Sequence, residues 1–163
     1  PTEPERAATE IADVERVARE ALASVRETVE GYRVPTLAVE LAAARSALAT
    51  AGIAGSVEPA PEGLPPAVDA VLGWAVREGV TNVLRHSGAS RAEVLLRQQA
   101  ERIQLVIADN GRGTPQQPVA GMGLRNLRER ALLLPGGRFE LDARPDGGLR
   151  VAVSFLVMET SSR

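Results

Sequence analysis

Three polar side chains that could do chemistry recur every fourth residue in the stretch "REGVTNVLRHSGAS", and they are Glu78, Asn82 and His86. Because each helical residue advances by about 100°, neighbours in this series lie about 40° apart on one helix face. An amide oxygen suits a Mg²⁺ shell completed by waters and phosphates, a carboxylate can orient a water, and an imidazole can donate to a phosphate. Taken alone, this spacing is also typical of a solvated helix face.

Gly79 lies inside the same helical stretch. A glycine in a helix interior costs about 1 kcal/mol relative to alanine. Its presence therefore indicates close packing at this point or the close approach of a ligand to the backbone.

The second stretch is "ADNGRG", in which Asp109 follows an apolar strand and stands beside Gly111 and Gly113. A carboxylate there could accept a hydrogen bond from the exocyclic amine of adenine, while the glycines let the backbone approach the ring. Guanine has an oxygen at the corresponding position, which Asp109 would repel. The alternative is an ordinary turn, for which "DNGRG" is also a good sequence.

The third stretch is "GMGLRNL", with Gly121 and Gly123 placed directly before a predicted helix. Free N–H groups at a helix N-terminus can bind phosphate, and glycines allow close contact, although such a pair is a weak signal alone. The preceding "TPQQPVA" could serve as a flexible lid, and without nucleotide we expect disorder over about 112–121. Together, the three stretches describe magnesium, adenine and phosphates.

The composition is that of an ordinary globular protein of 163 residues, with a net charge of -2. This balance gives no electrostatic reason to expect nucleic acid or an anionic membrane as a partner. The chain has no cysteine and one histidine, so disulfides are excluded and a structural zinc site is improbable. No apolar run approaches the roughly 20 residues of a membrane span, and we expect a cytoplasmic location.

Periodicity and turn signals predict which elements position these residues. Helices are expected over about 37–51, 66–86 and 124–134, and strands near 56–58 and over 91–99, 102–109, 137–144 and 149–157. "PDGG" is a strong hairpin signal between the last two strands. Because several strands adjoin through short turns, we expect an α+β fold, a two-layer sandwich whose mixed, mostly antiparallel sheet is covered by helices on one face.

Residues from about 4 to 32 form a separate pattern, a long amphipathic helix with a narrow apolar stripe. A narrow stripe with an opposite charged face favours the seam of a two-helix or four-helix bundle. The alternative is a surface helix that packs on its own domain. We therefore divide the chain at 1–34 and 35–163, and since it begins at Pro1 we expect it to be part of a longer protein.

In this order the three stretches resemble the N, G1 and G2 boxes of the GHKL (Bergerat) ATP-binding fold, shared by sensor histidine kinases, type II topoisomerases, MutL-type repair proteins and heat-shock chaperone ATPases. They look most like the histidine kinases that pair with NarL/LuxR-type response regulators. The resemblance covers about residues 64–157. Residues 1–34 are similar to the second helix of that family's dimerisation and phosphoacceptor hairpin.

The resemblance implies roles for individual residues. Asn82 would be the magnesium ligand and Glu78 its acidic companion in catalysis. The other expected nucleotide contacts are Arg85, His86, Asp109, Gly111, Gly113, Gly121, Gly123, Leu124 and, on the last strand, Ser154.

By resemblance the chain would bind ATP and Mg²⁺. The full-length kinase would be a homodimer. It would transfer phosphoryl groups by way of a histidine to a response regulator of the NarL/LuxR type. The family's acceptor histidine lies on the first hairpin helix, which is missing here, so we do not expect autophosphorylation. The alternatives are a serine kinase of the anti-sigma-factor type, a plain ATPase of the same fold, or a degenerate nucleotide-binding interaction module.

Overall fold

The computed structural model describes residues 35–112, 120–145 and 147–157. The helix predicted over 4–32 lies outside these residues, so its role and the division at residue 34 stay predictions. No helix within the described ranges is both long and apolar enough to cross a membrane.

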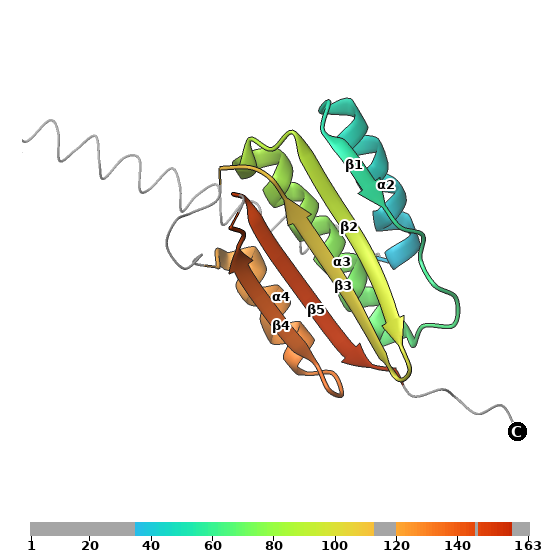
Figure 1. The fold of residues 1–163 in the computed structure, drawn as a ribbon. Coiled ribbons are helices and arrows are strands. Elements are labelled where there is room, and N and C mark those ends of the chain that lie inside the picture. Colours follow the sequence, from blue (N-terminus) through green and yellow to red (C-terminus); the bar gives the residue numbers. More distant parts are fainter. Residues whose placement is uncertain (1–34, 113–119, 146, 158–163) are drawn as a thin grey trace, which may run out of the picture. The chain divides into compact units, whose positions relative to one another are not determined.

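The described part of the chain is built on a five-stranded sheet with the order β1-β2-β3-β5-β4 (Figure 1). β1 runs parallel to β2, and the other neighbours are antiparallel. The mixed, mostly antiparallel sheet predicted from the short turns is confirmed. The strands are β1 (Ala54–Val57), β2 (Arg91–Gln99), β3 (Arg102–Asp109), β4 (Arg138–Ala143) and β5 (Leu149–Leu156).

Helices cover one face of this sheet (Figure 1). They are α2 (Leu37–Thr50), α3 (Pro66–Asn82) and α4 (Met122–Leu132). The spacing of apolar residues explains this arrangement, because positions three or four apart are the ones that become buried. In α2 these residues are Leu37, Leu41, Ala44 and Leu48.

The helix predicted over 66–86 differs from the observed one in its last turn. α3 ends at Asn82, and the chain continues as a π-helical turn, η1 (Val83–Ser87), which Gly88 closes in the left-handed region at φ 61°. A π turn closes with i→i+5 hydrogen bonds. The uniform 100° step therefore does not apply to His86, and its position relative to Asn82 follows from η1.

The core forms between α3 and the central strands β3 and β5. Strand residues that face the helices pair across the two strands, as Ile103 does with Phe155 and Leu105 with Val153. Leu72 of α3 is fully buried against this layer. Because strand residues alternate between faces, the same register places the intervening residues on the face without helices.

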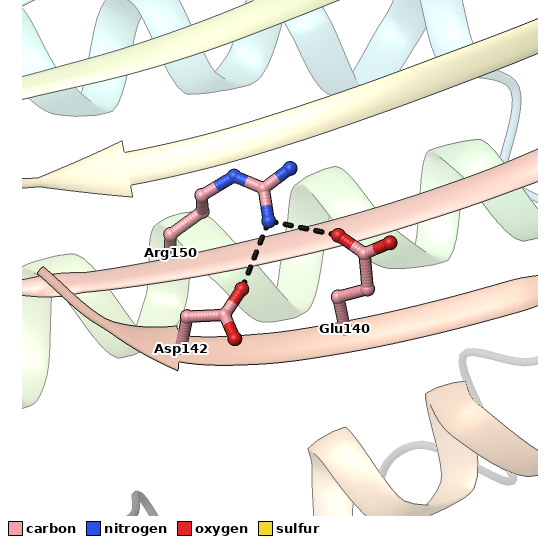
Figure 2. Close-up of polar contacts among 3 residues, drawn as sticks. All are labelled: Glu140, Asp142 and Arg150. Atoms are coloured by element: carbon pink, nitrogen blue, oxygen red, sulfur yellow. Dashed lines mark hydrogen bonds and ion pairs between the residues drawn. The ribbon is translucent and has the colours of Figure 1, made fainter.

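On that uncovered face, Arg150 of β5 joins two carboxylates of the edge strand β4. Its Nη1 donates to Glu140 Oε2 and to Asp142 Oδ2, each at 2.9 Å, and Figure 2 shows both carboxylates converging on one guanidinium. The hydrogen bond to Glu140 is the main cause of a raised pKa of Arg150, and the bond to Asp142 adds to it. This contact ties β4 to the sheet.

Leu72→Ala should strongly destabilise this unit, because it empties a fully buried site on the helix that carries Glu78 and Asn82. A leucine-to-alanine change in a core costs about 2–5 kcal/mol of unfolding free energy. The matched control is Leu133→Ala, at a residue that is 83% exposed, with an expected change within about 0.5 kcal/mol. Urea denaturation measures both, and equal losses would contradict this account of the core.

Candidate functional site

A cavity of about 300 Å³ opens where the end of α3, the end of β3 and the beginnings of α4 and β5 meet. Its volume lies at the lower end of the range for small-molecule sites. The lining residues are Gly79, Asn82, Val83, His86, Ser87, Ile107, Asp109, Gly121, Leu124, Leu149 and Val151.

The sheet supplies an apolar wall for this cavity. Ile107 of β3 and Val151 of β5 are directly opposite each other in the antiparallel register, and both are buried. Leu149 extends the wall at the start of β5. Apolar surface of this kind suits the face of an aromatic ring, while polar groups at the margin set its orientation.

Glu78 and Asn82 form one polar pair at the α3 side. They lie one helical turn apart, and Asn82 Nδ2 donates to Glu78 Oε1 at 3.1 Å. Because the nitrogen end of the amide is directed at the carboxylate, the oxygen end is directed elsewhere. The amide oxygen is the atom that a hard cation would need.

Asp109 is a buried carboxylate at the sheet side, with only 5% of the residue exposed. Its Oδ1 accepts from the Gly111 N–H at 2.7 Å, and its Oδ2 accepts from the Leu149 N–H at 3.3 Å. A buried charge requires such partners. The two backbone donors fix the direction of the carboxylate in the cavity.

Glycines allow the segments around the cavity to approach one another closely. A Cβ on Gly123 would overlap the Glu78 carboxylate, and one on Gly111 would overlap the Ser87 carbonyl oxygen. Gly148, at φ 85°, likewise leaves no room for a side chain beside the Asp109 carbonyl. The start of α4 and the β4–β5 hairpin are thereby brought against the polar groups of α3 and β3.

The structure brings most of the predicted site residues together. Asn82, His86, Asp109, Gly121 and Leu124 line the cavity. Three further predicted residues contact this lining from behind. Glu78 accepts from Asn82, the Gly111 N–H donates to Asp109, and Gly123 packs against Glu78.

Two predicted residues lie away from this group, and a third is not described. Arg85 is exposed on η1 and does not line the cavity. Ser154 lies near the other end of β5 on the uncovered sheet face, where its Oγ accepts from Arg102 Nη1 at 3.0 Å. Gly113 and the lid prediction fall outside the described residues.

The cavity also contains residues that the sequence reasoning missed. Leu149 and Val151 belong to the wall because of the β3–β5 register, which local patterns do not reveal. Their alternation after "PDGG" was the available signal, since it places both on one strand face. Val83, Ser87 and Ile107 also line the cavity.

Comparison with known proteins agrees with the fold and with the order of the site elements. Residues 68–159 match the family described as histidine kinase-, DNA gyrase B- and HSP90-like ATPases. The matched range includes most of α3, the loop that follows Asp109 at the end of β3 (the Asp109 loop), α4 and β5. The chain belongs to this ATPase family, and it contains the family's ATP-binding domain.

Two curated relatives indicate the branch of this ATPase family to which the chain is most similar. The chain is 33% identical over 138 residues to the sensor histidine kinase YvfT of Bacillus subtilis, covering 83% of this chain and 37% of that protein. It is 30% identical over 155 residues to the sensor histidine kinase DesK of the same organism, covering 93% and 42%. The chain thus spans less than half the length of these curated relatives, and the resemblance to the histidine kinase branch is confirmed.

A solved structure supports the fold. The ATP-binding domain of PrrB from Mycobacterium tuberculosis superposes with a TM-score of 0.58 at 24% identity, over 76% of this chain and 96% of that one. The predicted GHKL architecture, an α+β sandwich with helices on one face, is therefore confirmed.

Gly111→Ala should destabilise the protein, because the new Cβ would overlap a backbone oxygen, which cannot rotate away as a side chain can. We expect a loss of about 1–3 kcal/mol, as for overpacked sites. Gly121→Ala is the matched control, since its Cβ would meet nothing within 4 Å and its φ is -64°. If urea denaturation gives the same free energy of unfolding for both variants, the Gly111–Ser87 contact does not restrict the loop that follows β3.

Proposed function

We propose that this chain is the catalytic ATP-binding domain of a two-component sensor histidine kinase, which presents Mg²⁺-ATP for phosphoryl transfer to a histidine and thence to a response regulator. The observation that carries this proposal is the placement of a buried carboxylate, Asp109, across one cavity from the Glu78–Asn82 pair. His86, the only histidine in the chain, belongs to the cavity itself, so the acceptor is a different histidine.

The Asp109 end of the cavity is suited to adenine. A carboxylate has about four acceptor positions, so the two backbone donors from Gly111 and Leu149 leave capacity for the exocyclic amine. Ile107 and Val151 provide the apolar surface for the ring. A guanine oxygen at the same place would meet a negative charge and would be repelled.

The beginning of α4 is suited to phosphate. The first N–H groups of a helix have no acceptor within the helix and carry partial positive charge. Gly121 takes the N-cap position without a side-chain cap from any described residue, and the first helical bond of the Arg125 N–H returns to the Gly121 carbonyl at 3.0 Å. The amides of the first turn can therefore bind oxygen atoms of the triphosphate.

The Glu78–Asn82 pair is suited to the metal. The Asn82 oxygen would take one Mg²⁺ position, with waters and phosphate oxygens in the others. Glu78 holds the amide nitrogen and so fixes which amide atom is presented. Bound magnesium would supply neutralisation of the charge on the transferred phosphoryl group; Asn82 would hold it, and Glu78 would orient Asn82.

The partner that fits best is a response regulator of the NarL/LuxR type, with a homodimer as the form of the full-length kinase. The support is the resemblance of the three boxes and the amphipathic pattern over 4–32. The relatives YvfT and DesK are both sensor histidine kinases, which favours this proposal over a serine kinase of the anti-sigma-factor type.

Asp109→Asn should weaken ATP binding by about 1–3 kcal/mol, the range for a lost hydrogen bond to a charged group, and reduce the preference for ATP over GTP. Calorimetric titration with each nucleotide measures both effects. Asp142→Asn makes the same chemical change at an exposed β4 residue that binds Arg150, and it should leave affinity unchanged. Unaltered affinity and selectivity in the Asp109 variant would contradict the adenine role.

Asn82→Ala should weaken ATP binding mainly when Mg²⁺ is present, because the lost oxygen is a metal ligand and not a base contact. The measurement is a pair of titrations, one with excess magnesium and one in EDTA. The wild-type protein in EDTA provides the control for metal removal. An equal loss of affinity under both conditions would argue against a ligand role for Asn82.

A further inference from the structure

Ser87 connects η1 to the loop that follows β3. Its Oγ donates to the Val83 carbonyl at 2.7 Å and accepts from the Ala89 N–H at 2.9 Å, and its own carbonyl accepts from the Arg112 N–H at 2.9 Å. The residue is partly buried and lines the cavity. Ser87 is therefore hydrogen-bonded to Val83 before Gly88, to Ala89 after it, and to Arg112 in the loop that follows Asp109.

The hydroxyl of Ser87 already serves as a donor within the protein. A serine has one O–H hydrogen, and that hydrogen is given to Val83. Any effect of this hydroxyl on ligand binding must therefore act mainly through the residues that it positions.

The contact from Ser87 to Asp109 passes through Gly111. A Cβ on Gly111 would lie 2.7 Å from Ser87 Cβ and 2.8 Å from Asp109 Oδ1, so the three residues are packed without a gap. The Gly111 N–H donates to that same carboxylate oxygen at 2.7 Å. A displacement of Ser87 would thus be passed to the carboxylate.

The Ser87 hydroxyl adds two hydrogen bonds at the end of the π-helical turn η1. In a turn closed by i→i+5 bonds, the Val83 carbonyl is not matched to the residue 87 N–H as it would be in an α-helix. The Ser87 hydroxyl donates to that carbonyl, and Gly88 at φ 61° returns the chain so that the Ala89 N–H donates to Ser87 Oγ. The side chain therefore holds the widened turn closed.

Resting on the proposed function, we infer that Ser87 is a positioning residue for the adenine end of the site. By joining the last turn of η1 to the Asp109 loop, it sets the spacing between the helical side of the cavity and the carboxylate. It acts on the base end and not on the metal.

Ser87→Ala should raise the Kd for ADP in EDTA and for Mg²⁺-ATP by the same factor, about fivefold to tenfold, because the loss of one or two hydrogen bonds lowers the fraction of protein in the positioned conformation and the apparent Kd rises as that fraction falls. Ser87→Cys keeps the size of the side chain with much weaker hydrogen bonds, and it should show a similar loss. Calorimetry at a temperature well below unfolding measures both. Equal losses with and without metal distinguish this role from that of Asn82.

Thr50→Val is the matched control, since Thr50 Oγ1 also donates to a carbonyl four residues earlier, at 2.9 Å to Ser46, but on α2. It should leave both Kd values unchanged. Amide hydrogen exchange without nucleotide provides a second readout, in which exchange at Arg112 should be at least about fivefold faster in the Ser87→Ala variant than in the wild type.

The outcomes separate the proposed function from the role of Ser87. Wild-type protein that binds neither ADP nor Mg²⁺-ATP overturns the proposed function and with it the nucleotide role of Ser87. If the wild type binds and the Ser87→Ala variant binds within twofold, only this inference is overturned. It is also overturned if Thr50→Val loses as much affinity, or if exchange at Arg112 is unchanged.

Discussion

The site depends on how closely α3 approaches β3, and this approach is possible because residue 79 is a glycine. A Cβ at Gly79 would overlap the side chain of Ile107. Ile107 is a buried wall residue of the cavity, and Glu78 and Asn82 stand within one turn of Gly79 on α3. A glycine in a helix interior costs about 1 kcal/mol relative to alanine. At residue 79 it allows α3 to lie close enough to β3 for both to line the cavity.

From this contact the two ends of the cavity acquire different chemistry. The sheet side has a buried carboxylate that backbone N–H groups hold in place, with apolar walls around it. The helix side has an amide that donates a hydrogen bond to a carboxylate, close to the start of α4, where no described side chain caps the helix. A ligand with an aromatic base and a charged, metal-binding tail satisfies both ends, which is why the geometry and the family membership point to the same nucleotide.

Much of the fold could be predicted because the signals are local. The strand ranges 91–99 and 102–109 coincide with β2 and β3, and "PDGG" is followed by β5 at Leu149. The confirmed family resemblance came from the order and spacing of three short stretches. Features that depend on tertiary pairing could not be predicted in the same way. The β3–β5 register brings Val151 to the cavity and leaves Ser154 on the other face. The π turn lies where the chain passes from α3 towards β2, and its last residue, Ser87, accepts a hydrogen bond from the Arg112 N–H in the loop that follows β3.

The most direct test of the central claim is calorimetric titration of the wild-type protein with ATP, in magnesium and in EDTA, with GTP as the control. We predict adenine-selective binding that is tighter with magnesium, as follows from the proposed recognition of the base at one end of the cavity and of a metal-bound triphosphate at the other. Equal affinity for ATP and GTP, or no binding of either, would contradict it.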